Sequence, residues 1–389
     1  MTYIKTIFST SCRIVACFSI SLLLSCGASA GDVVAWAKGA DIVCVARLAS
    51  TQTVDDASTD PTTPYKTVLN KLRVIKVLKG HLPPGGVQIE SHPLDLERMR
   101  RLGITTLSGR RPFGGFAPGE DYLLFVNYTP DTPYVNMISD TSAIDIGSKL
   151  ADMSQTEPLL ANIVSQFSVA LSGSNQESQL SVLDTAGSFG TILWERTPAS
   201  EGVAAQELAS ISKQDKAAIT RNLQEQLVPA VLALAKSDDT TVKAFALSTA
   251  AGLQVEEVIT PLITFAHASP SYSSLVLPAL GDYKSLKATP FLVPLLESPS
   301  AKVREAAATS LRSIQDRRSL PFLLNALHDD DETVAYLACY TLWEITNQYP
   351  PPALAAFPSS RESYMLRWNI WAKANKIEIE RLKQEVNRK

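Results

Sequence analysis

Few residues in this chain have the type and spacing that catalysis or metal binding requires. The four histidines, His81, His92, His267 and His328, are not spaced as metal ligands on one helix or strand. The acidic run Asp329–Glu332 lacks the glycine and the ligand spacing of a calcium loop, so we expect it to cap a helix instead. No nucleophile elbow, zinc-protease, Walker or dinucleotide-binding motif follows residue 30. We therefore predict no metal, no cofactor and no catalytic residue.

The most distinctive charged group is a cluster of arginines between residues 92 and 118. The whole chain has a formal net charge of −3, which is no signature of nucleic-acid binding, so we predict no nucleic-acid partner. An arginine cluster in such a chain could meet an anionic partner, because guanidinium groups bind phosphates and carboxylates through paired hydrogen bonds. The alternative is a solvated face that packs against the protein itself. The cluster consists of Arg98, Arg100, Arg101, Arg110 and Arg111.

The first 30 residues are typical of a secretory leader. An apolar stretch, Ile14–Leu24, follows two basic residues, and the small residues Ala28–Ala30 precede Gly31. The segment Leu23–Cys26 also resembles a bacterial lipobox, in which Cys26 is lipidated and becomes the first residue. Two mature forms therefore stay open, a secreted or periplasmic protein that begins at Gly31 and a membrane-anchored lipoprotein. We expect membrane contact only through an anchor at Cys26, because no later stretch is long and apolar enough to cross a bilayer.

Only two cysteines, Cys44 and Cys339, lie outside the leader. Each lies within an apolar run, and the two belong to different predicted domains. We predict two buried free thiols, and a single disulfide between them is the alternative.

Residues 31–150 show the alternating pattern of β-strands separated by polar or Gly/Pro-rich loops. Five strands in a segment of this length predict a small barrel or sandwich. The expected strands are Ile42–Ala46, Val68–Leu78, Val87–Ile89, Tyr122–Val126 and Tyr134–Ile138.

From about Pro158 the apolar period changes from two to about 3.6 residues. One frame, with apolar residues at i, i+4, i+8 and i+11, recurs at intervals of 30 or 31 residues from Val242, Tyr272, Val303 and Val334. A shorter apolar helix precedes each copy, and the polar turn between them supplies Ser and Asp caps. The repeating unit is therefore a helical hairpin. The short helices start near Pro229, Pro261, Pro290 and Pro321, and Pro278 predicts a kinked or shortened second helix in its copy.

The segment Val303–Ile314 resembles a HEAT repeat of the short type that is also found in phycobilisome lyases. The resemblance implies an α-α superhelical solenoid, a fold with a long surface that many unrelated proteins use for binding. Residues 151–227 are expected to form an irregular helical cap before repeats at 228–349. A last helix from about Ser360 places Tyr364, Trp368 and Trp371 on one face, and the charged residues after Ile377 are expected to fray.

The β region has a second, weaker resemblance. Ala40–Val43, Val74–Gly80 and Pro118–Phe125 are similar to the OB-like domains related to tissue inhibitors of metalloproteinases. Inhibition in that family requires a cysteine at the mature N-terminus whose amine and carbonyl chelate the protease zinc. Here the mature chain begins at Gly31 or at an acylated Cys26, so the resemblance implies the fold rather than the activity.

These observations predict a multidomain protein, β then α: a small OB-like β-barrel or sandwich followed by a HEAT solenoid. The predicted boundaries are a signal peptide at 1–30, the β domain at 31–150, the irregular helices at 151–227, the repeats at 228–349 and a capping helix with a tail at 350–389. We predict an exported adaptor that holds a protein or an envelope polymer, with the arginine cluster, Trp368 and Trp371 as candidate contacts. The alternatives are a hydrolase or lyase with a site at the domain junction, and a protease inhibitor that acts through the β domain.

Overall fold

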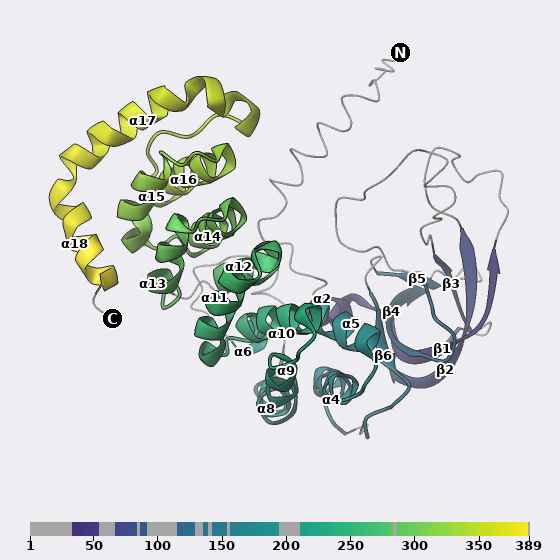
Figure 1. The fold of residues 1–389 in the computed structure, drawn as a ribbon. Helices are drawn as coiled ribbons and strands as arrows, with labels where there is room; N and C mark the ends of the chain where they lie inside the picture. The colour runs from purple at the N-terminus through teal and green to yellow at the C-terminus, as the bar shows by residue number, and fades with distance from the viewer. Residues whose placement is uncertain are drawn as a thin grey trace, which may run out of the picture. The chain divides into compact units, whose positions relative to one another are not determined.

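The computed structural model describes residues 33–53, 67–83, 86–91, 115–128, 135–138, 142–153, 156–193, 211–282 and 286–387. The chain forms two compact units, one from Ser29 to Gln254 and the other from Val255 to Lys389. The first unit combines a β-sheet with helices, whereas the described part of the second contains helices alone (Figure 1). The predicted order, β then α, is confirmed. The boundary between the units lies after the first predicted hairpin.

The first unit contains a six-stranded antiparallel sheet with the strand order β3-β2-β1-β4-β5, and β6 pairs with β4 beside β5. The register places Cys44 of β1 opposite Leu124 of β4. The strands are β1 (Ile42–Thr53), β2 (Val68–Lys79), β3 (Val87–Ser91), β4 (Asp121–Tyr128), β5 (Val135–Met137) and β6 (Ala143–Gly147).

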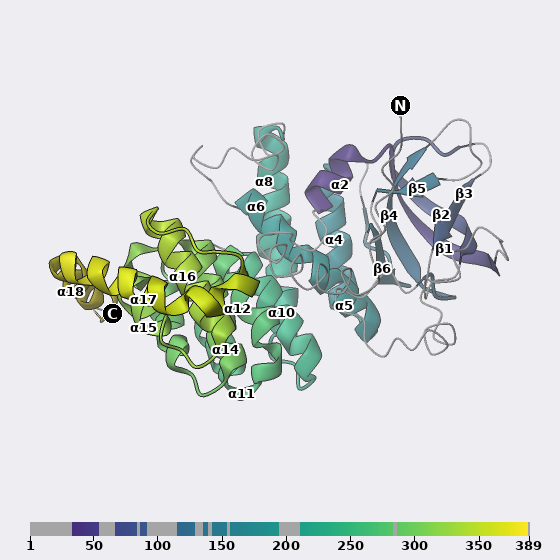
Figure 2. The same ribbon diagram turned by 90° about the horizontal axis from the view of Figure 1, so that it is seen from above.

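Apolar residues cover both faces of the central strands. On one face Cys44, Leu124 and Tyr122 belong to a buried cluster with residues of β2, β3 and β5. On the other face Phe125 packs against Trp36 of α2 (Val33–Gly39), with ring centroids 5.7 Å apart. Helices α2, α4 (Leu159–Leu171) and α5 (Gln176–Ala186) lie on this second side of the sheet (Figure 2). Double coverage explains why β1 and β4 begin with unbroken apolar runs.

Two elements of the first unit differ from the sequence prediction. Helix α2 lies where only strands were expected, and strand β6 was not predicted. The segment VVAWAKG of α2 is rich in valine, which favours strands, but as a helix it buries Val33, Val34 and Trp36 together. Tertiary packing therefore overrides local propensity here.

The helices on both sides of the predicted start of the repeats, at residue 228, differ in length and regularity. Helices α6 (Gly190–Leu193), α8 (Lys213–Asn222) and α9 (Val228–Leu234) are short, and a π-helical turn separates α8 from α9. The helix α10 (Thr240–Gly252) follows α9 and completes the first predicted hairpin. A Cβ atom on Gly190 would lie 1.9 Å from the carbonyl oxygen of Gly252, so only glycine permits this close packing.

The described part of the second unit contains three successive hairpins, and their second helices α12, α14 and α16 lie side by side (Figure 1). Pro290 and Pro321 lie in the first turn of a first helix, as predicted. Pro278 lies inside α12, and the prediction that this helix is kinked or shortened stays a prediction. The pairs are α11 (Ile259–Ala268) with α12 (Ser273–Asp282), α13 (Thr289–Leu292) with α14 (Ala301–Ile314), and α15 (Leu320–Ala326) with α16 (Glu332–Thr346).

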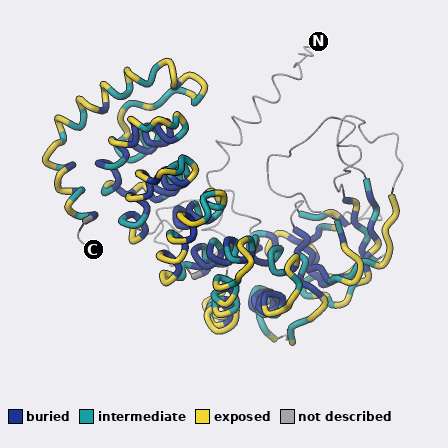
Figure 3. Tube along the Cα trace, in the orientation of Figure 1, coloured by how far each residue is buried: buried dark blue, intermediate teal, exposed yellow. Residues whose placement is uncertain are grey.

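The predicted frame is buried in the last two hairpins except at Ile345, which is partly exposed; Figure 3 shows the buried sides of α14 and α16 in dark blue. In α14 the buried residues Val303 and Leu311 have the same positions as Val334 and Leu342 in α16. Between these positions only Arg304, Glu305 and Thr309 of α14 and Tyr340 of α16 are partly exposed, and the other intervening side chains are buried. The repeat register read from the sequence is therefore confirmed for these hairpins.

Two further helices follow α16 and cover the end of the array. Helix α17 (Phe357–Ala374) buries Phe357 and Trp368. Helix α18 (Lys376–Asn387) packs beside α15 (Figure 1) and against the turn Arg317–Ser319. The prediction that this charged segment frays is wrong, because three of its four apolar residues, Ile379, Leu382 and Val386, share one face and are buried.

Candidate partner-binding surface

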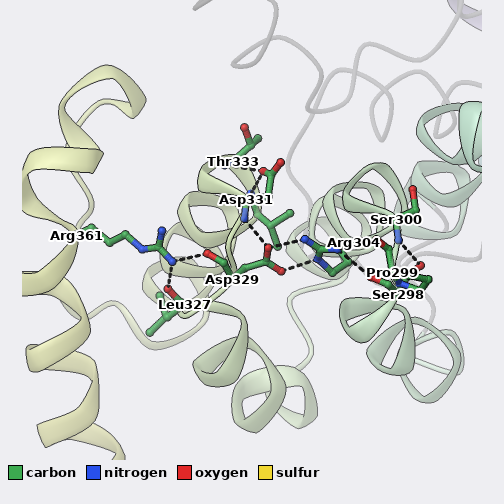
Figure 4. Close-up of polar contacts among 10 residues, drawn as sticks. Ser298, Pro299, Ser300, Arg304, Leu327, Asp329, Asp331, Thr333 and Arg361 are labelled. Atoms are coloured by element: carbon green, nitrogen blue, oxygen red, sulfur yellow. Dashed lines mark hydrogen bonds and ion pairs between the residues drawn. The ribbon is translucent and has the colours of Figure 1, made fainter.

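A polar network joins the turns of successive hairpins in the second unit (Figure 4). Arg304, in the first turn of α14, donates from Nε and Nη2 to the two carboxylate oxygens of Asp329, at 2.7 and 2.8 Å. Its Nη1 donates to the carbonyl oxygen of Ser298, at 2.9 Å. The side chains of Arg304 and Asp329 are only 16% and 8% exposed, and their hydrogen bonds raise the pKa of the Arg304 guanidinium. The pair therefore connects two neighbouring interhelix turns.

The acidic run at the α15–α16 turn caps a helix, as predicted. Asp331 accepts hydrogen bonds from the backbone N–H groups of Thr333, at 2.9 Å, and Val334, at 3.2 Å. Asp329 in turn accepts from the backbone N–H of Asp331, at 2.8 Å. Asp239 caps α10 in the same way, whereas Ser300 at the start of α14 makes no cap with its side chain.

In the last hairpin, the arginine that donates hydrogen bonds to the interhelix turn comes from α17. Ala335 occupies in α16 the position that Arg304 occupies in α14, so it cannot supply one. Nη2 of Arg361 instead donates to the carbonyl oxygens of Leu327 and Asp329 (Figure 4). Helix α17 is thereby attached to the turn that Arg304 holds from the other side.

A chain of aromatic rings runs from α16 to α17. Tyr340 packs edge-on against Trp343, with ring centroids 5.1 Å apart, and also contacts Tyr336. Tyr336 meets Phe357 at 5.3 Å, and Phe357 meets Tyr364 at 6.3 Å. Burial is the main cause that raises the pKa of Tyr336. In this series of aromatic contacts the rings of Tyr336 and Phe357 are buried, and those of Tyr340 and Trp343 are partly exposed.

The partly exposed end of this ring chain lies beside a charged pair. Arg312 of α14 donates to Glu344 of α16, with Nε and Oε2 3.0 Å apart, and its guanidinium carbon lies 4.2 Å from the centre of the Tyr340 ring. We call the group Arg312, Tyr340, Trp343 and Glu344 the α14–α16 surface. Both partners of the ion pair are partly accessible, with side chains 13% and 21% exposed. A planar cation, two amphipathic rings and a carboxylate thus form one rigid surface.

The aromatic residues predicted on the last helix have different environments. Trp368 is fully buried, where it contacts Trp371 and Tyr349 at ring distances of 5.7 and 5.3 Å. Tyr364 and Trp371 are partly exposed. Trp368 thus packs as part of the cap on α16, and of the two predicted tryptophans only Trp371 is accessible to a partner.

The other predicted contact residues fall outside the described residues. They are Cys26 and the cluster Arg98, Arg100, Arg101, Arg110 and Arg111, so these sites stay predictions. The described strands that flank the cluster, β3 and β4, end and begin at Ser91 and Asp121.

The histidines that the structure describes are exposed, whereas the described cysteines are buried. His81, His267 and His328 are exposed, and within the described ranges no three His, Cys, Asp or Glu side chains form a metal-binding group. Cys44 and Cys339 are free and buried, as predicted. Burial raises the pKa of the Cys44 thiol to about 12 and that of Cys339 to about 11, so neither is a reactive thiolate.

The carboxylates where the sheet meets α5 serve to position that helix. Glu120 accepts from the side-chain amide of Asn175, at 3.0 Å, and Asn175 caps α5. Asp145 accepts from the hydroxyl of Ser178, at 2.6 Å, and from the backbone N–H of Gly147. Both acidic groups are therefore used as hydrogen-bond acceptors that hold α5 on β4 and β6.

The comparison with known proteins agrees with the hairpin architecture. A family model described as HEAT repeats matches residues 264–343, which run from α11 to the middle of α16. No match to a curated protein is found. Residues 264–343 are therefore similar to HEAT repeats, in agreement with their helical hairpins.

The sequence prediction missed the α14–α16 surface, although a signal for it exists. The repeat interval relates Arg312 in α14 to Trp343 in α16, and both lie on the polar side of the buried frame. An aromatic residue at a position that is polar in the neighbouring copy could have indicated a contact surface.

Proposed function

We propose that the chain is an exported adaptor that holds a protein partner on the α14–α16 surface. HEAT repeats generally mediate protein interactions, and their stacked helices offer an extended surface. The proposal rests on the composition of the α14–α16 surface, which contains Trp343, Tyr340 and Arg312. Trp, Tyr and Arg are the residue types that most often dominate the binding energy of a protein interface. The Arg304 network and the buried frame hold these side chains on rigid helices, which lowers the entropic cost of binding.

Capture of partners from a cell-envelope extract tests this proposal. Trp343→Ala should lower partner recovery at least tenfold, because truncation of a central aromatic contact typically costs about 2 kcal/mol or more of binding energy. Lys302→Ala, which truncates an exposed side chain on α14, is the matched control and should leave recovery unchanged. Equal recovery with both variants, both folded by circular dichroism, would exclude the surface as the binding site.

The location in the cell envelope belongs to the same proposal and rests on the leader pattern. Mass spectrometry of the protein from its native host should find Gly31 as the first residue or a lipid on Cys26. An intact N-terminus at Met1 would contradict export.

We also propose that the sheet is an OB-like barrel and that the arginine cluster adds an anionic contact. The strand order supports the barrel, because β3 and β5 at the two ends of the order are neighbours in space. Charge reversal of the clustered arginines should weaken capture of an anionic partner, and this loss should shrink as salt rises. The enzyme and protease-inhibitor alternatives have no specific observation in their favour among the described residues.

A further inference from the structure

The outer face of the last two helices carries the most exposed aliphatic side chains that the structure describes. Leu366 and Ile370 on α17 are 62% and 58% exposed, and Ile377 at the start of α18 is 89% exposed. The opposite face of α17 buries Phe357 and Trp368 in the cap, so the helix cannot turn to hide the outer residues. A terminal helix of a repeat array normally presents a polar outer face. The exposed apolar face therefore requires a reason.

Cations flank these aliphatic side chains. Arg367, Lys373 and Lys376 are exposed, and no ion pair joins any of the three to an acidic side chain in the described part of the chain. Arg367 lies near the ring of Tyr364, 5.6 Å from its centre. Leu366, Arg367, Ile370 and Lys373 lie on α17, and Lys376 and Ile377 begin α18. A surface that combines cations with aliphatic side chains suits an anionic apolar boundary.

We propose that this face of α17 and α18 lies on the surface of a bilayer that contains anionic lipids. The cations would contact lipid phosphates, and Leu366, Ile370 and Ile377 would insert at the boundary between headgroups and acyl chains. Among the described residues, no helix is long and apolar enough to cross a membrane. The sequence predicted membrane contact only through a lipid anchor at Cys26. The face of α17 and α18 would be a second membrane contact that does not depend on that anchor.

A second copy of the chain fits the face less well. Antiparallel pairing of two α17 helices centred on Ile370 places Arg367 of one copy beside Lys373 of the other, and parallel pairing places Lys373 against Lys373. Both arrangements bring like charges together, which opposes association. The charge of the face instead complements an anionic surface.

The size and shape of the face also favour a bilayer over a protein partner. The three aliphatic side chains expose only on the order of a few hundred Å², whereas stable protein interfaces bury about 800 Å² on each partner. Helix α17 ends at Ala374, before Ile377, so a straight partner helix could not follow all three residues. A fluid lipid surface needs neither a large area nor a continuous helix, because each side chain inserts separately.

Vesicle binding tests the proposal. The chain from Gly31 onward, which lacks the apolar leader, is mixed with vesicles of phosphatidylcholine alone or of phosphatidylcholine with phosphatidylglycerol, and bound protein is separated by flotation. We expect binding to the anionic vesicles only, and weaker binding at high salt. The double variant Leu366→Ser/Ile370→Ser should lower the partition coefficient at least tenfold. Reversal of two charges, Arg367→Glu/Lys373→Glu, should lower it more than about 25-fold, at roughly fivefold or more for each cation.

Two substitutions elsewhere in the same unit are matched controls. Leu286→Ser changes an aliphatic side chain that is 55% exposed outside the face, and Lys302→Glu reverses an exposed cation on α14. Both should bind anionic vesicles as the unchanged protein does. Equal binding to the two kinds of vesicle, or controls that lose as much as the face variants, would overturn the proposal. It would also be wrong if vesicles bind no protein and Leu366→Ser/Ile370→Ser converts a dimer into a monomer in analytical ultracentrifugation.

Discussion

Replacement of Arg304 by alanine should destabilise the repeats by about 2–3 kcal/mol. The substitution removes two hydrogen bonds to the Asp329 carboxylate, at 2.7 and 2.8 Å, and one to the carbonyl oxygen of Ser298. Removal of one partner from a fully buried ion pair costs about 3–5 kcal/mol, and a hydrogen bond to a charged group contributes about 1.5–3 kcal/mol. We expect a loss at the low end of these ranges, because the Arg304 side chain is 16% exposed. In addition, the Asp329 carboxylate still accepts a hydrogen bond from the backbone N–H of Asp331.

A double-mutant cycle in urea measures this contribution. Arg304→Ala, Asp329→Ala and the double variant are compared with the unchanged chain, and we expect a coupling energy of about 1–2 kcal/mol between the two side chains. Arg304→Lys keeps the charge but not the planar fork, so it should restore less than half of the loss. The inference that this pair connects the turns fails if Arg304→Ala costs less than about 0.5 kcal/mol or if the two substitutions are additive.

Three further substitutions test other parts of the fold. Leu311→Ala should lower the free energy of unfolding by about 2–5 kcal/mol in urea titrations, whereas Lys302→Ala should stay within about 0.5 kcal/mol of neutral; similar losses would show that the repeat frame is wrong. Trp368→Ala should lower the free energy of unfolding by about 3–5 kcal/mol, and Trp371→Ala, at a partly exposed residue, should lower it by less than half of that. If Trp368→Ala lowers it no more than Trp371→Ala does, Trp368 does not cap the repeats. The pKa of Cys44 rises from 9.0 to about 12 on folding, so stability is full below about pH 9 and falls as the pH rises toward 12. Urea midpoints at about pH 8 and about pH 10.5 should therefore differ, and a Cys44→Ala variant that keeps the whole difference would assign the alkaline loss to other groups.

The repeat architecture could be predicted from the sequence because its signal is both periodic and repeated. Val303 and Leu311 share a frame with Val334 and Leu342, and a frame that recurs at a fixed interval is difficult to produce by local propensity alone. The strands were predicted from alternation, and the structure extends β1 from Ala46 to Thr53, where polar residues on both faces give no alternating signal.

The elements that the sequence prediction missed depend on long-range packing. Helix α18 has only three apolar residues on its buried face, among charges that suggested fraying. Its stability comes from contact with α15 and the turn before it, which no window along the chain can contain. Helix α2 is a similar case, because the ring of Phe125 that Trp36 meets lies far away in sequence.

The candidate surface was harder to predict than the fold. Trp368 and Trp371 share a helix face, but whether a tryptophan is buried or accessible depends on what α16 places opposite it. Arg312, Tyr340 and Glu344 lie on two helices, and only the stacking of those helices brings them together. Spacing along one helix cannot show such a group.

The dependence of the last hairpin on Arg361 means that the turn of this hairpin is fully hydrogen-bonded only when α17 is present. Arg304 finds its acidic partner 25 residues later, but the backbone carbonyl of Asp329 receives its donor from a residue 32 positions further on. A chain that stops before Arg361 leaves the carbonyl groups of that turn without this donor and the apolar sides of α15 and α16 without their cover. Such a fragment exposes the features that proteases and chaperones recognise. A fragment without α17 therefore differs from the longer chain in the polar turn and the apolar surface that it exposes.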